Sequence, residues 1–165
     1  MATVIGVSAP VEGVRFEVVD PSDDDAQAAM RAYFAELDAR FPHGFDPGDA
    51  LGAGAAAMGP PDGAFVLARS TDGVVAGCGG VQRHTADTGE IKRMWIAPHA
   101  RGAGLGRRLL AELEQRCREL GYTTVVLDTN ATLTEAIAMY TRAGYAATER
   151  YNDNPYAERW FTKAL

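Results

Sequence analysis

The segment EIKRMWIAPHARGAGLGRRLLAELEQRCREL, Glu90 to Leu120, decides the fold because it holds a strand, a glycine-rich loop and an amphipathic helix in succession. Residues 90–96 have the β-branched and aromatic content of a strand, and Pro98 ends it because proline cannot donate a ladder hydrogen bond. Beyond the loop, apolar residues recur every three or four positions and form one helical face: Leu105, Leu109, Leu113, Cys117 and Leu120. The segment therefore predicts a strand joined by a glycine loop to a helix.

The loop holds three glycines within five residues, at Gly102, Gly104 and Gly106. Glycine lets the backbone approach a ligand closely, and the first N–H groups of the next helix are unpaired and lie at the positive end of its dipole. This arrangement suits a phosphate group, although a tight connection that binds no ligand explains the same residues. The loop lacks the Gly-Lys-Ser/Thr ending of a magnesium-nucleotide loop and the third glycine position of the dinucleotide fingerprint.

The 165 residues suit one domain, which we place at residues 14–165 after an N-terminal tail at residues 1–13. Hydrophobic periodicity, capping residues and turn residues predict the elements around the central segment. The expected strands are 14–19, 64–69, 74–82, 123–127, 145–151 and 158–163, and the expected helices are 21–40 and 132–143, with a short helix or a loop at 50–59.

Local patterns predict details of these elements. Gly77, Gly79 and Gly80 inside the third expected strand indicate a bulge or a close approach of a ligand or another segment. Thr132 followed by Glu135 matches a capping box at the start of the last expected helix. Because strand side chains alternate, the central strand should divide its residues between two faces. One face would carry Glu90, Lys92, Met94 and Ile96, and the other Ile91, Arg93 and Trp95.

The net charge of −6 argues against a nucleic-acid-binding protein, but the charge is unevenly distributed. Residues 1–89 hold 5 Lys/Arg and 13 Asp/Glu, whereas residues 90–165 hold 11 and 9. The basic excess falls in the half with the glycine loop, as an anionic ligand would favour, although a difference of this size also arises by chance.

Other classes of protein are also disfavoured. No apolar run approaches the roughly 18 residues of a membrane span, and residues 1–13 lack the features of a secretory signal, so we expect a cytoplasmic protein without membrane contact. Cys78 and Cys117 are too few for a disulfide framework and fit core thiols better than a bridge or a nucleophile. The three histidines lack ligand-like spacing with one another or with cysteine, so no metal site is expected.

The loop resembles the signature of the GNAT superfamily of acyl-CoA-dependent N-acyltransferases, Arg/Gln-x-x-Gly-x-Gly/Ala between a strand and a helix. Arg101, Gly104 and Gly106 match it. The family's fold implies an α/β (α+β) chain with a mixed, mostly antiparallel sheet of six or seven strands, flanked by about four helices.

A second match lies in the last helix, where Ala136-x-x-Met139-Tyr140-x-x-x-Gly144-Tyr145 resembles the family's Ala-x-x-Leu-Tyr-x-x-x-Gly-Phe. The central strand EIKRMW and the segment Tyr151-x-x-Asn154-Pro155 look like those of a bacterial group whose substrates are mostly unassigned. The sequence departs from the family where Leu133 replaces a common Asn, and Asn130 is a candidate to take over its cofactor contacts.

The resemblance implies acetyl-CoA as cofactor. The backbone of the central strand would pair with the pantetheine arm, and the glycine loop with its arginines would hold the pyrophosphate. The expected cofactor-binding residues are Met94, Trp95, Ile96, Arg101, Gly102, Ala103, Gly104, Leu105, Gly106, Arg107 and Asn130.

The resemblance also implies direct attack of an amine on the thioester, with no covalent enzyme intermediate. Tyr140 matches the family's tyrosine that protonates the CoA thiolate, although helical spacing also fits a core aromatic residue. Glu90 lies where some members place a general base, which would take a proton from the ammonium through water. An ion pair between Glu90 and Lys92 or Arg83 is the alternative interpretation.

The resemblance implies a small-molecule amine as acceptor, and the sequence gives weaker signals about its identity. Four basic residues are candidates to bind a carboxylate or phosphate of the substrate: Arg40, Arg83, Lys92 and Arg93. They favour an amino acid or another acidic amine over a polycation such as an aminoglycoside, whereas the acidic first half would attract cations. Phe41 and Phe45 are expected either in a loop that lines the pocket or as ordinary core anchors.

A protein of another class would share this cofactor half. A non-catalytic acyl-CoA-binding regulator or partner protein would keep the glycine loop without turnover, and Leu133 leaves room for it. The presence of both Tyr140 and Glu90 favours the enzyme. We expect a monomer or a homodimer.

Overall fold

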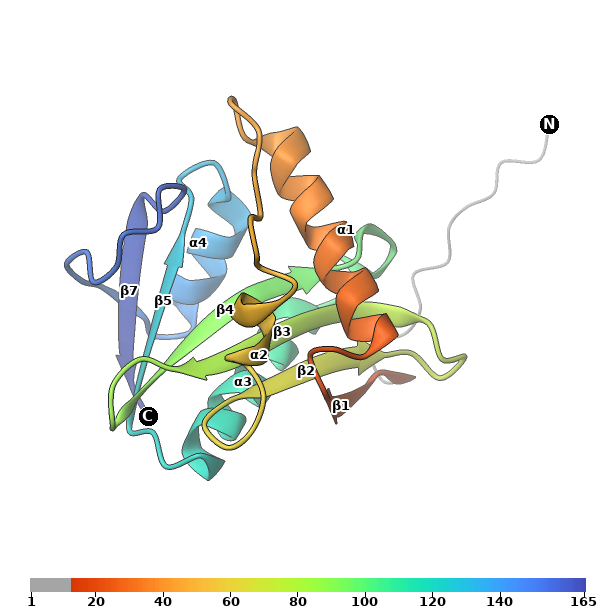
Figure 1. Ribbon diagram of the computed structural model, residues 1–165, viewed down its shortest axis with the longest axis horizontal. Helices are drawn as coiled ribbons and strands as arrows, with labels where there is room; N and C mark the ends of the chain where they lie inside the picture. Colours follow the sequence, from red (N-terminus) through yellow and green to blue (C-terminus); the bar gives the residue numbers. More distant parts are fainter. Residues whose placement is uncertain (1–12) are drawn as a thin grey trace.

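The computed structural model describes residues 13–165, which form a seven-stranded sheet with helices on both faces (Figure 1). Residues 1–12 of the predicted tail lie outside the described residues. The strands are β1 (Arg15–Val19), β2 (Ala64–Arg69), β3 (Val75–Arg83), β4 (Thr88–Ile96), β5 (Thr124–Thr129), β6 (Ala146–Ala147) and β7 (Arg159–Ala164). The helices are α1 (Asp24–Arg40), α2 (Ala53–Ala56), α3 (Leu105–Glu119) and α4 (Thr134–Arg142), with a 3₁₀ turn at Pro98–Ala100.

The strand order is β1-β2-β3-β4-β5-β7-β6, and only β4 and β5 pair in parallel. The expected mixed, mostly antiparallel sheet is therefore confirmed. The parallel ladder spans three residue pairs and ends at Glu90 and Val126, after which the two strands diverge (Figure 1). Because β3 covers only the other side of β4, residues 91–96 have no strand partner toward β5, and we call this side of β4 its unpaired edge.

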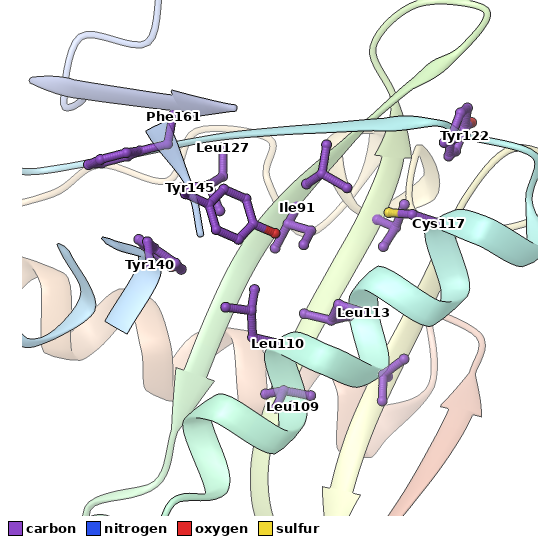
Figure 2. Packing of buried hydrophobic residues seen from close by; sticks show 13 residues of the cluster. Ile91, Leu109, Leu110, Leu113, Cys117, Tyr122, Leu127, Tyr140, Tyr145 and Phe161 are labelled. Atoms are coloured by element: carbon purple, nitrogen blue, oxygen red, sulfur yellow. The ribbon is translucent and has the colours of Figure 1, made fainter. Parts of the chain in front are cut away.

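Apolar clusters fill the space between the sheet and its helices. Behind the sheet in Figure 1, α3 directs its apolar face at the strands, as the period of leucines predicts. Figure 2 shows this cluster, in which Leu109, Leu110, Leu113 and Cys117 pack with Ile91, Leu127, Tyr140, Tyr145 and Phe161. On the opposite face, Met30, Phe34 and Leu37 of α1 pack with Phe65, Leu67 and Cys78.

The glycines of β3 allow this close packing, so both parts of their interpretation hold. A Cβ at Gly79 would lie 2.6 Å from Leu113 Cδ1, and one at Gly80 would overlap Met58. The register between β3 and β4 also shifts between Cys78 and Gly80, which marks a bulge.

The bulge overturns the predicted alternation of the central strand. Cys78 pairs with Trp95 and Gly80 with Lys92, so β4 has one residue more than β3 between these pairs. Arg93 occupies the bulge with φ of +56°, in the left-handed region. Consequently Met94 and Ile96 join Ile91 on the α3 side, whereas Arg93 and Trp95 face the α1 side.

Two further predictions about the last part of the chain were wrong. The capping box does not form, because Glu135 pairs with Arg40 of α1 and the Thr132 hydroxyl donates to Asn130 Oδ1. The strand expected at 145–151 is only Ala146–Ala147, since Tyr151 directs its hydroxyl to Glu90 instead of continuing along β7. Residues 50–59 hold the short helix α2.

None of the helices within residues 13–165 is both long enough and apolar enough to cross a membrane.

We expect Gly79→Val to lower the free energy of unfolding by about 1–3 kcal/mol, because the added side chain must displace Leu113 of α3. Urea denaturation of the variant and the parent chain measures the difference. Val74→Thr is the control at a site 48% exposed, with an expected change within about 0.5 kcal/mol. An unchanged midpoint for Gly79→Val would contradict the close packing of α3 on β3.

Candidate active site

Two adjoining cavities lie along β4, and the first of them also reaches β5. The first, of about 460 Å³, is bounded by α1, residues 41–50, the two strands and residues 154–157; we call it the aromatic cavity. The second, of about 420 Å³, is bounded by α1, β4, residues 100–106 and α4; we call it the loop cavity. Six residues line both cavities: Tyr33, Leu37, Met94, Leu133, Ala136 and Tyr140. The cavities therefore meet beside Tyr140.

The glycine loop forms one end of the loop cavity. Gly102 and Gly104 have φ of +86° and +79°, which glycine adopts most readily, and the space where their Cβ atoms would stand is open. Gly106 has a different role, since a Cβ there would lie 3.1 Å from Met139 Sδ of α4. Gly104 is the N-cap of α3, so the unpaired N–H groups and the positive end of the helix dipole lie beside the loop cavity. The first turn of α3 has no acidic residue that would neutralise this positive end. Leu105 lines this cavity as well.

A chain of ion pairs runs along the loop cavity and joins three elements. Arg101 donates from Nε to the Ile96 carbonyl, at 3.0 Å, and contacts Glu36 of α1 through Nη2. Arg40 lies 3.9 Å from Glu36 and also binds Glu135 of α4, with Nη2 to Oε2 at 3.2 Å. Arg40 thus lies at the loop cavity with its charge neutralised, and not in the aromatic cavity.

Most residues expected at the cofactor line the loop cavity, but three do not. Met94, Trp95 and Ile96 border it along the unpaired edge of β4. Ala103 and Arg107 are absent from the lining of both cavities. Asn130 lines the aromatic cavity, where its amide nitrogen donates to the Tyr156 carbonyl at 2.8 Å and its oxygen accepts from Thr132.

Tyr140 lies at the junction of the two cavities and is 7% exposed. Its ring is also part of the core, 5.9 Å from Tyr145 and 6.1 Å from Phe161 between ring centres. Burial raises the pKa of Tyr140, and the charge of Asp128 raises it further. The phenol therefore keeps its proton at neutral pH. Tyr33 of α1 lines the same junction, and burial raises its pKa too.

Aromatic rings from three segments form one wall of the aromatic cavity. Phe45 lies 4.6 Å from Tyr156 and 5.4 Å from Phe34 between ring centres. Phe41 is 5.9 Å from Tyr156. Both interpretations of Phe41 and Phe45 hold, since they pack with α1 and also line the cavity.

Two cations line the aromatic cavity. Lys92 Nζ lies 3.9 Å from Glu90 Oε1, farther than the hydrogen-bond donors of Gln82 and Tyr151 at the same carboxylate. Arg93 Nη1 donates to the Ala50 carbonyl at 2.5 Å, and its guanidinium lies over the Phe34 ring at 5.4 Å. Burial lowers the pKa of Arg93. Within residues 13–165, no carboxylate forms an ion pair with it.

Glu90 lies outside both cavity linings and is 5% exposed. Gln82 Nε2 and the Tyr151 hydroxyl each donate to it at 2.9 Å. The alternative interpretation named Lys92 or Arg83 as its ion-pair partner; Lys92 is near, whereas Arg83 pairs with Asp62 at 3.6 Å and lines neither cavity.

The residue that the sequence analysis missed is Asp128 on β5. Its carboxylate lines the aromatic cavity and accepts from Asn152 Nδ2 at 2.6 Å and Asn154 Nδ2 at 3.3 Å. The sequence held a usable signal, because an ionisable residue directly follows the three apolar residues Val125 to Leu127 of an expected strand. The nearby charge is also felt at Tyr140 and Tyr33, whose pKa values it raises.

The two cysteines and the groups that could bind a metal bear on nucleophilic and metal-dependent chemistry. Burial raises the pKa of Cys78 to about 12 and that of Cys117 to about 12, so neither thiol is ionised near neutral pH. In the described part of the chain, no group of three or more His, Cys, Asp or Glu residues is placed to hold a metal ion.

Comparison with known proteins gives the class. The sequence profile of the Acetyltransferase (GNAT) family matches residues 23–145. This chain belongs to the GNAT family of acetyltransferases, a family that uses acetyl-CoA as co-substrate.

Individual relatives agree with this class. An uncharacterized N-acetyltransferase of Schizosaccharomyces pombe is 39% identical over 98 residues, 59% of this chain and 60% of the relative. A protein of Azospirillum brasilense named IAA acetyltransferase is 39% identical over 90 residues, 54% of this chain and 58% of the relative. The matches thus span about three fifths of the length of these curated relatives.

Solved structures match over nearly the whole chain. A Klebsiella pneumoniae protein assigned as an acyl-CoA N-acyltransferase has a TM-score of 0.76 and 28% identity, covering 92% of this chain and 97% of that one. A GNAT acetyltransferase of Staphylococcus aureus has a TM-score of 0.79 at 16% identity, covering 92% and 99%, and shares the fold.

Proposed function

We propose that this protein transfers an acetyl group from acetyl-CoA to the primary amine of a small molecule by direct attack. One observation carries the proposal: two cavities of different chemistry meet beside Tyr140, one bounded by the glycine loop at a helix N-terminus and the other by charged and aromatic side chains. An acetyl donor in the first cavity and an amine in the second would meet there.

The loop cavity fits the cofactor. The amides of residues 102–106 and the terminus of α3 would hold the pyrophosphate, in open space that side chains at Gly102 and Gly104 would otherwise fill. The unpaired edge of β4 at Met94, Trp95 and Ile96 would bind the pantetheine arm as an added strand. Bound acetyl-CoA supplies an activated acetyl group as a thioester.

Asp128 in the aromatic cavity and Tyr140 at the junction would move the protons. Asp128 would accept a proton from the acceptor ammonium, so that the neutral amine forms the new C–N bond. Tyr140 would give its phenolic proton to the sulfur when the C–S bond breaks, and would recover a proton from the nitrogen that becomes the amide. One proton leaves to solvent through Asp128 in each turnover. Glu90, the base expected from the family, would support β4 through its contacts with Gln82 and Tyr151.

The charges of the aromatic cavity favour a small acidic amine such as an amino acid. Arg93 and Lys92 supply the positive charges. Within residues 13–165, Arg93 forms no ion pair with a carboxylate. The cytoplasmic location and the monomeric or homodimeric state stay predictions. Incubation with acetyl-CoA and a panel of primary amines, followed by assay of free thiol, tests the function. CoA binding without thiol release for any amine would favour the non-catalytic regulator.

We expect Gly104→Val to abolish detectable CoA binding, because a branched side chain would fill the open space of the loop and strain a residue with φ of +79°. Calorimetric titration with CoA measures the affinity. Thermal unfolding of the same variant separates lost binding from lost folding. An unchanged CoA affinity would contradict the placement of the pyrophosphate at this loop.

Tyr140→Phe should lower kcat by about 10²-fold or more, because the ring still packs but no phenolic proton is available. Steady-state thiol release measures kcat, and calorimetry should show CoA affinity close to that of the parent chain. Retention of full turnover would remove Tyr140 from the acid role.

Asp128→Asn should lower kcat/KM by about 10²-fold near neutral pH, and the loss should shrink as pH rises, because solvent then supplies the neutral amine. A pH profile of kcat/KM measures this. Glu90→Gln is the comparison: it should lower the melting temperature by disturbing a buried network, without the same pH dependence. The reverse pattern in the two profiles would return the base role to Glu90.

A further inference from the structure

Resting on the acetyltransferase function proposed above, we infer that the acceptor is a primary amine that carries both an aryl group and a carboxylate, as an aromatic amino acid does. Its carboxylate binds Arg93, its ring lies against the aromatic wall, and its amine faces Asp128 and Tyr140. All of these groups line the same cavity.

The backbone places Arg93 in the cavity by a strained conformation. The left-handed region is unfavourable for residues other than glycine, and Arg93 has φ of +56°. The bulge turns its side chain from the α3 face to the α1 face, beside Phe34 and the backbone of Ala50. Strain of this kind persists where surrounding structure holds it, and it concentrates at binding sites.

The charge of Arg93 is the second observation. Arg40, Arg69, Arg101 and Arg116 each bind one or more carboxylates. Arg93 is half-buried, and within the described residues its guanidinium contacts the Ala50 carbonyl, the sulfur of Met30 and the face of Phe34. A half-buried guanidinium without a carboxylate partner is a strong receptor for a planar carboxylate, because two parallel N–H···O bonds form and the charge is compensated.

The aromatic side chains of the cavity wall favour an acceptor that carries an aryl group. Phe34, Phe41, Phe45 and Tyr156 present neighbouring rings, and the Tyr156 hydroxyl accepts from the Asp46 N–H at 2.9 Å, which fixes the loop against the wall. Aromatic rings at centroid separations of about 4.5–7 Å attract each other beyond simple area burial. An aryl group therefore gains more from this wall than a short aliphatic chain.

Asp128 provides a negative charge in the cavity, which suits the ammonium group of the acceptor. Asp128 keeps its carboxylate at the lining, with amide donors from Asn152 and Asn154 on Oδ2. Two carboxylates, Asp46 and Asp128, and two cations, Lys92 and Arg93, line this cavity. Charges of both signs suit a zwitterion, whereas a polycation would meet the two cations as like charges. Asp128 is the carboxylate whose charge acts on Tyr140, so the ammonium is assigned to Asp128 and the carboxylate to Arg93.

The experiment compares four acceptors: L-phenylalanine, phenethylamine without the carboxylate, L-alanine without the ring, and spermidine. We expect kcat/KM for L-phenylalanine to exceed that for each of the others by about 10-fold or more. Arg93→Asn should lower kcat/KM for L-phenylalanine by about 10-fold or more and leave phenethylamine unchanged, since asparagine tolerates the left-handed φ. Arg93→Lys should recover part of the loss. Arg31→Gln on the exposed face of α1 is the control, and it should change neither substrate.

The outcomes separate this inference from the proposed function. Equal use of phenethylamine or spermidine, or an equal effect of Arg93→Asn on phenethylamine, would overturn the inference while acetyl transfer stands. If no amine releases thiol although acetyl-CoA binds, the proposed function fails, and calorimetric titration of CoA-saturated protein with L-phenylalanine then decides the inference. Binding that Arg93→Asn weakens by about 10-fold supports the acceptor site, and absence of binding overturns it.

Discussion

The early end of the parallel pairing between β4 and β5 is the constraint on which the rest of the site depends. The ladder stops at Glu90 and Val126, and the diverging strands leave a backbone edge on β4 and a gap that no strand fills. Helices α1 and α4 and the glycine loop close this gap into two joined cavities. A continuous parallel ladder would satisfy every backbone group and leave no opening at the centre of the sheet.

The bulge at Arg93 gives the two cavities their different chemistry. By adding one residue to β4 it sends Met94 and Ile96 toward the α3 core and turns a guanidinium toward the α1 side. The guanidinium of Arg93 thereby lies beside Phe34 and the Ala50 carbonyl. Within residues 13–165 it forms no ion pair with a carboxylate. Such a charge is costly for folding alone and is readily compensated by an anionic ligand.

Sequence patterns predicted the elements well where local physics dominates. The leucine period of α3, the Asp-Gly hairpin between β2 and β3, and the glycine loop depend on neighbouring residues, and the structure contains each of them. Patterns failed where a distant residue competed. Glu135 pairs with Arg40, 95 positions away, instead of capping its own helix. Tyr151 departs from the strand expected at 145–151 and donates to Glu90, which lines neither cavity.

The sequence by itself determined the family, the order of strands and helices, and a loop suited to phosphate, because helix period, turn residues and glycine spacing are local properties of the chain. Tertiary structure alone decided which charged residues share a cavity. The extra residue in β4 moves the side chains that follow it to the opposite face of the sheet. A periodic sequence pattern does not predict this change, because side chains alternate regularly only in an unbroken ladder. The side chains that line the aromatic cavity therefore depend on the register between β3 and β4, whereas the loop cavity depends on the residues from Arg101 to Gly106.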